Sequence, residues 1–147
     1  MAVALKQANV ITEVGPGGVL HSLFSTIAVR LEGGSWGGRF PHITGRLYGG
    51  RLKRREADAA LREMRVIKKE LSELPPTAVV WDADDPSLDP PWGRSVAEHV
   101  RSMAQYHVTT TGRNLVDEII DNLESLRDYG GTLDIISYDD RALPPLT

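Results

Sequence analysis

Hydrophobic residues recur along the chain at spacings that predict three helices. Apolar positions three or four residues apart predict amphipathic helices over residues 19–31, 54–74 and about 113–128, each with one face on the core. Residues rich in β-branched side chains, without that spacing, predict strands over residues 2–14, 77–81 and 132–137. Weaker patterns indicate a short helix or turn over 40–48, a short helix that begins with the Ser95 and Glu98 capping box, and an edge strand over 105–109.

Glycine and proline clusters separate these elements and indicate a single domain. We expect breaks at Gly15–Gly18, at Pro75-Pro76, and at Gly130-Gly131 after the last helix. The order of helices and strands predicts one α/β domain over residues 2–138, with a small mixed sheet of about four short strands flanked by three to four helices. Residues 139–147, which include Pro144-Pro145, are expected to form a loose tail.

Composition narrows the classes of function. The chain has 147 residues, a net charge of −3 and no cysteine, which excludes disulfides and thiolate metal sites. This charge gives no overall basic surface for nucleic acid, so we expect no nucleic-acid partner. No apolar run reaches the roughly 20 residues of a membrane span, and the first residues do not resemble a signal peptide. We therefore expect a cytoplasmic protein without a membrane partner.

The segment Trp81–Gly93 carries four aspartates, three prolines and two tryptophans directly after an apolar run. We interpret Asp84, Asp85 and Asp89 as an exposed acidic surface for a basic partner, because clustered carboxylates repel one another unless they are solvated or matched by cations. Trp92 beside them is the expected anchor of that interface. Trp81 is expected to be the buried end of the preceding strand.

Asp82 and Asp84 also leave an enzymatic alternative open. An apolar strand followed by two aspartates one residue apart resembles the signature of haloacid dehalogenase phosphatases, in which the aspartates act around Mg²⁺. Asp85-Pro86 stands where that family has small residues, and no glycine-rich phosphate loop follows. No other catalytic or metal-binding pattern is present, so we predict a protein that is not an enzyme and has no cofactor, catalytic residue or metal site.

Three further side chains receive structural roles. Trp36 and Phe40 are predicted to pin the glycine-rich segment around them to the core. His21, among apolar residues of the first helix, is predicted to be a hydrogen-bonded core histidine.

Several motifs in a fixed order carry a resemblance to a known family. They are Leu20-His21-Ser22-Leu23-Phe24-Ser25-Thr26, Gly34-Ser35-Trp36-Gly37-Gly38-Arg39-Phe40-Pro41, Val80-Trp81-Asp82, Pro90-Pro91-Trp92-Gly93, Gly112-Arg113-Asn114-Leu115 and Gly130-Gly131. In this order they resemble the immunity protein 70 family (Imm70) of bacterial polymorphic toxin systems. The resemblance implies a protein that binds and neutralises a cognate toxin, and it supplies no site residues. A nuclease toxin would present a basic surface to the acidic segment, and a non-enzymatic scaffold is the remaining alternative; the sequence predicts no oligomeric state.

Overall fold

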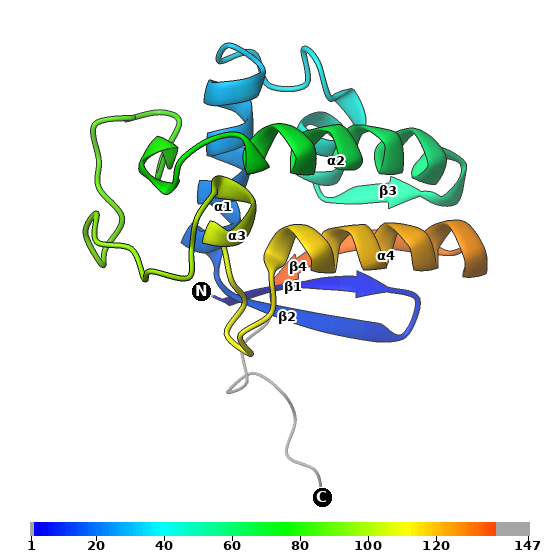
Figure 1. Ribbon diagram of the computed structural model, residues 1–147. Coiled ribbons are helices and arrows are strands. Elements are labelled where there is room, and N and C mark those ends of the chain that lie inside the picture. The colour runs from blue at the N-terminus through cyan, green and yellow to red at the C-terminus, as the bar shows by residue number, and fades with distance from the viewer. Residues whose placement is uncertain (1, 138–147) are drawn as a thin grey trace, which may run out of the picture.

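The computed structural model describes residues 2–137 of the chain (Figure 1). Its strands and α-helices are, in chain order, β1 Ala2–Gln7, β2 Val10–Pro16, α1 Gly17–Thr26, β3 Arg51–Lys53, α2 Ala57–Ser72, α3 Met103–Tyr106, α4 Leu115–Tyr129 and β4 Thr132–Ser137. π-Helical turns cover Ile27–Leu31, directly after α1, and Pro41–Leu47; 3₁₀ turns cover Arg54–Glu56 and Pro76–Ala78. The predicted tail over residues 139–147 lies outside the described residues.

The four strands form one sheet in the order β2-β1-β4-β3. The prediction of a small four-stranded sheet flanked by helices is confirmed. The expected mixture of parallel and antiparallel strands is not found, because all three pairings are antiparallel. Residues 2–14 form a hairpin instead of one strand, because the chain reverses at Ala8-Asn9, where Ala8 has a φ of 55°. The last strand, β4, pairs with the first, so segments from both ends of the described chain meet in the middle of the sheet.

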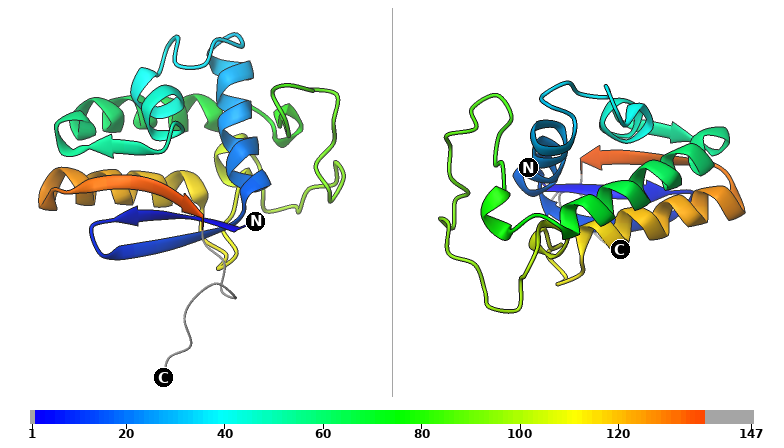
Figure 2. Two further views of the ribbon diagram at one scale, coloured as in Figure 1. Left: turned by 180° about the vertical axis from the view of Figure 1, so that it is seen from behind. Right: turned by 45° about the horizontal axis from the view of Figure 1, so that its top comes forward.

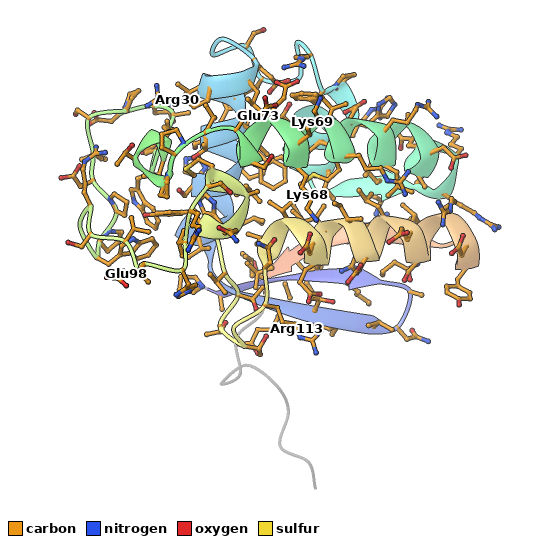
Figure 3. The ribbon with its side chains drawn as sticks, viewed as in Figure 1. Arg30, Lys68, Lys69, Glu73, Glu98 and Arg113 are labelled. Atoms are coloured by element: carbon orange, nitrogen blue, oxygen red, sulfur yellow. The ribbon has the colours of Figure 1, made fainter. Side chains whose placement is uncertain are left out.

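Helices α2 and α4 lie side by side over one face of the sheet (Figures 1 and 2). Their buried apolar residues lie on the faces that the periodicity predicts: Ala57, Ala60, Leu61, Met64, Ile67 and Leu71 in α2, and Leu115, Val116, Ile119, Leu123 and Leu126 in α4. In α4, Ile120 is only partly buried, while the polar Glu118 and Asn122 are buried. On their outer side the Lys68 ammonium is 2.7 Å from the Asp117 carboxylate, and Lys68 lies between the two helices in Figure 3. The apolar faces of α2 and α4 therefore supply much of the core.

Three predicted elements are wrong. Residues 77–81 form no strand, although Val79 and Val80 are buried as expected. No helix begins at Ser95; the next helix is the short α3. Residues 105–109 form no edge strand and have only an isolated bridge between Val108 and Asn114. At Val80 hydroxyl groups of α1, rather than a neighbouring strand, satisfy the backbone.

Helix α1 holds the segment after Pro76–Ala78 through three hydroxyl groups on one of its faces. Val80 N–H donates to Thr26 Oγ1 at 3.0 Å, and Ser22 Oγ donates to Val80 O at 3.1 Å. One turn along, Ala83 N–H donates to Ser25 Oγ at 3.1 Å. Ser22, Ser25 and Thr26 are fully buried, so these bonds satisfy backbone groups that have no strand to pair with.

The same hydroxyl face contacts a buried histidine, His107. Its Nε2 is 2.9 Å from Ser22 Oγ. We assign the proton of this hydrogen bond to His107 Nε2, because Ser22 Oγ has a single proton and lies 3.1 Å from Val80 O; Nδ1 is then the unprotonated nitrogen. Burial lowers the pKa of His107 from 6.5 to about 3, so the imidazole is neutral at physiological pH.

This depressed pKa predicts acid sensitivity. Between pH 6.5 and about 3 the unfolded imidazole binds a proton that the folded one does not, so the free energy of unfolding falls as the pH falls. The contribution of His107 is about 1.4 kcal/mol per pH unit within this window. Urea unfolding between pH 7.5 and 4.5 should therefore show a shallower loss of stability for His107→Gln than for the unchanged chain, while the exposed His99→Gln leaves the slope as it is. Equal slopes for all three proteins would contradict a neutral, buried His107.

A second prediction concerns the hydroxyl face. Thr26→Val keeps the shape of the side chain but leaves the buried Val80 N–H without its acceptor, which should lower the free energy of unfolding by about 1–3 kcal/mol. Thr77→Val, at an exposed threonine of the adjoining turn, is the matched control and should change stability by less than about 0.5 kcal/mol. Chemical denaturation measures both. Equal stabilities of the two variants would show that Thr26 does not support the segment.

Candidate functional site

Residues 79–102 form a long segment without helix or strand that projects from the body of the molecule (Figures 1 and 2). Loops of this length without regular structure are uncommon in compact domains and are usually functional. The buried side chains of Val79, Val80 and Pro90 anchor the segment. Trp81, expected to be fully buried, is only partly so; its ring packs on α1 at Gly18, where an added Cβ would lie 2.7 Å from the indole. We call residues 79–102 the anchored loop.

The three aspartates predicted to form an acidic surface are all exposed on the anchored loop. The Asp84 carboxylate makes no hydrogen bond or ion pair with any residue in the described range 2–137, whereas the Asp84 backbone N–H donates to Asp82 Oδ1 at 2.9 Å. Asp85 accepts hydrogen bonds from the N–H and Oγ of Ser87, at 3.2 and 2.5 Å, which shape a local turn. Asp89 is paired with Arg94 at 2.5 Å. Asp84 and Asp85 therefore carry negative charge that no described cation offsets at contact distance.

Trp92 lies on the same loop with half of its surface exposed, at 50%. Its indole N–H donates to Tyr106 Oη at 2.8 Å, and its ring meets the edge of Trp81 at a centroid distance of 5.3 Å. Both contacts hold the ring in place while one face remains open. A fixed, half-exposed tryptophan beside carboxylates is typical of an interface anchor.

A polar chain that the sequence did not predict lies where the anchored loop meets α1. His21 Nε2 is 3.2 Å from Asp82 Oδ1, and His21 Nδ1 is 2.5 Å from Tyr48 Oη. The backbone N–H of Asp84 and the His21 ring hold the pKa of Asp82 below its usual range. Burial, followed by the charges of Asp82 and Asp84, raises the pKa of Tyr48. His21 is therefore a partly exposed bridge between two segments, not a core histidine; no sequence spacing links these three residues.

Trp36 and Phe40, predicted together as structural aromatics, occupy different environments. Phe40 is 3% exposed and belongs to the core. Trp36 is 37% exposed and stacks on Tyr48 at a centroid distance of 5.2 Å, with its ring also over His21 at 6.3 Å. The indole of Trp36 thus extends the surface that begins at Asp82 and Asp84.

The phosphatase alternative requires a different arrangement around Asp82. The haloacid dehalogenase signature places its aspartates at the carboxyl end of a strand in a parallel sheet, but Asp82 follows no strand and the sheet is antiparallel. Asp82 Oδ1 already accepts from the Asp84 backbone N–H at 2.9 Å and contacts His21. Within residues 2–137 no three histidine or carboxylate side chains are grouped so that they could hold a metal ion.

No helix within residues 2–137 has the length and apolar character needed to cross a bilayer.

The different burial of the two aromatic residues gives a prediction. Phe40→Ala should lower the free energy of unfolding by about 3–5 kcal/mol, the usual cost of truncating a buried aromatic. Trp36→Ala should cost less than half as much, because its indole is more than a third exposed and rests on Tyr48 and the partly exposed His21 ring. Chemical denaturation compares them directly. An equal cost for the two variants would place Trp36 in the core.

Comparison with known proteins bears on the role of this surface. The family model Immunity protein 70 (Imm70) matches residues 5–135, which takes in the sheet, the four helices and the anchored loop. No curated protein and no solved structure matches the chain. The matched range covers most of the chain and contains all the motifs that carry the resemblance in the sequence. The chain therefore belongs to the Imm70 family and is an immunity protein.

Proposed function

We propose that this immunity protein binds its cognate toxin through the anchored loop and neutralises it by covering its active surface. The observation that supports this most is the exposed acidic pair Asp84 and Asp85, which lies on the same loop as the half-exposed Trp92; Ala83 ties this loop to α1. Charge around an aromatic anchor is the usual composition of a specific interface. A loop that is already ordered loses less conformational entropy when it binds.

The chemistry of the surface points to a basic partner. A nuclease toxin is the class that fits best, since a nuclease binds the phosphate backbone of its substrate with lysine and arginine side chains. The carboxylates would occupy part of that basic surface and exclude the substrate. They would also steer the encounter, which raises association rates by ~10- to 10³-fold. In this proposal the immunity protein acts by binding, not by catalysis, and it meets its toxin in the cytoplasm of the cell that makes both.

The partner for the test is the C-terminal domain of the cognate toxin, to be sought in the gene next to that of this protein. Asp84→Asn with Asp85→Asn should slow association with this domain at least ~10-fold at low salt, while dissociation changes little, because the lost term is long-range attraction. Raising the salt concentration should shrink the difference, since ions screen exposed charges. Protection of cells that express the toxin should fall with the association rate. Stopped-flow or surface-bound kinetics at two salt concentrations give both rates.

The control removes the same charge elsewhere. Asp58→Asn with Asp121→Asn changes the net charge equally, at exposed aspartates at the start of α2 and on α4. This variant should associate nearly as fast as the unchanged protein. If both double variants slow association equally, only the net charge matters, and the anchored loop is not the binding surface. Unchanged kinetics of the loop variant would likewise remove Asp84 and Asp85 from the interface.

The two alternatives have separate tests. Turnover of p-nitrophenyl phosphate with Mg²⁺, abolished by Asp82→Asn, would replace the inhibitor role with phosphatase activity; we expect no turnover. A scaffold would assemble without any toxin, so light scattering of the pure protein that shows a stable higher oligomer, together with no binding to the neighbouring toxin domain, would favour that role.

A further inference from the structure

A cavity of about 260 Å³ opens beside Trp92 of the anchored loop. Val19 of α1, Trp92 of the anchored loop, and Tyr106, His107 and Val108 after it line the cavity. Trp92 and Val108 are exposed at 50% and 40%, so the cavity is bordered by apolar surface that a partner can reach. Its volume lies below the ~300–1,000 Å³ of typical small-molecule sites, and it suits one large side chain better than an extended ligand.

One wall of this cavity belongs to a residue with an unused hydrogen-bond acceptor. His107 is 2% exposed, and its Nδ1 is buried without a partner among the residues the structure describes. With the proton of the Ser22 hydrogen bond assigned to Nε2, the lone pair is on Nδ1. A buried acceptor without a donor is costly, and a ligand that supplies the donor recovers that cost.

The surroundings decide which kind of donor fits. Val19, Val108 and the two aromatic rings make the lining mostly apolar, which disfavours a charged occupant unless it is paired. Arg94 adds to this, because its charge acts on the Tyr106 hydroxyl in the cavity wall and would repel a second cation. Asp89 of the same loop is already paired with Arg94. A neutral aromatic ring with one N–H or O–H group meets both the apolar walls and the acceptor.

We propose that this cavity receives a tryptophan or tyrosine side chain of the toxin, whose N–H or O–H donates to Nδ1 of His107. This rests on the proposed toxin-binding role of the anchored loop and names the anchor that the toxin contributes. The aromatic residue would lie within the basic surface of the toxin, so that its neighbouring cations meet Asp84 and Asp85 while the ring packs against Trp92. Tryptophan and tyrosine are also the residues that most often dominate the energy of such interfaces.

Indole is the probe for the cavity, and 1-methylindole, of nearly the same shape but without the donor, is its control. Titration of the isotope-labelled chain alone, followed by the ¹⁵N shifts of the His107 ring and the Trp92 indole, should show indole binding at least ~5-fold more tightly than 1-methylindole, the value of one neutral hydrogen bond. The His107 Nδ1 resonance should move only with indole. Equal affinities, or shifts confined to other parts of the molecule, would overturn the proposal.

Two matched substitutions connect the cavity with the toxin. Val108→Phe fills the cavity from its rim, whereas Val10→Phe makes the same change at an exposed position of β2, which does not line it. Val108→Phe should abolish indole binding and speed dissociation of the toxin domain ~10-fold or more, with no change in the salt dependence of association. Val10→Phe should leave both as they are, and urea unfolding confirms that each variant is folded.

The two proposals fail in different ways. If the toxin domain binds the unchanged chain and Val108→Phe equally well, the cavity is not part of the interface, while the toxin-binding role stands. If the toxin domain does not bind the unchanged chain at all, the proposed function fails, whatever the indole titration shows.

Discussion

The buried backbone of Val80 is held by hydroxyl groups of α1, and the placement of the acidic part of the anchored loop depends on this interaction. A backbone N–H and C=O that leave water must find partners. Val80 has no strand beside it, and Thr26 and Ser22 of α1 take the place of one. Ser25 repeats the arrangement three residues later at Ala83. The hydroxyl groups on this face of α1 thereby bond to the backbone of an irregular segment, as the edge strand of a sheet would.

This anchoring explains why an irregular loop can present a defined surface. With Val80 and Ala83 held, Asp82 between them reaches His21, and the chain turns so that Asp84 and Asp85 are exposed. Further along, Trp92 is fixed by its hydrogen bond to Tyr106. On the other side, Trp36 stacks on Tyr48, the hydroxyl of which contacts His21. Side chains from distant parts of the sequence thus form one continuous surface of carboxylates and aromatic rings.

The sequence predicted those features that depend on local pattern. The amphipathic spacing of α2 and α4 located their buried faces, and Gly130, with a φ of 85°, ends α4 where a glycine was expected to do so. The strand predicted over residues 77–81 was wrong because an apolar run predicts that side chains are buried but does not show which groups the backbone N–H and C=O bond to. The hairpin within residues 2–14 was missed because its turn at Ala8-Asn9 has neither glycine nor proline.

The candidate site could be predicted only in part for the same reason. The aspartates and Trp92 are neighbours in the sequence, so their composition alone indicated an exposed acidic segment. The chain from Asp82 through His21 to Tyr48 joins three separate segments, and the cavity at His107 joins α1 to the anchored loop and the residues after α3. Such contacts are fixed by tertiary packing and leave no spacing to recognise.

Hydrogen exchange of the protein, free and in complex with its toxin domain, tests most directly whether the anchored loop is the binding surface. Amides at a protein–protein interface lose contact with water on binding and exchange more slowly, and each peptide reports on its own part of the chain. The account predicts added protection at residues 82–94 and 106–108, with little change in α2 and α4. Protection confined to α2, α4 or the β2 edge, with the anchored loop exchanging as in the free protein, would contradict it.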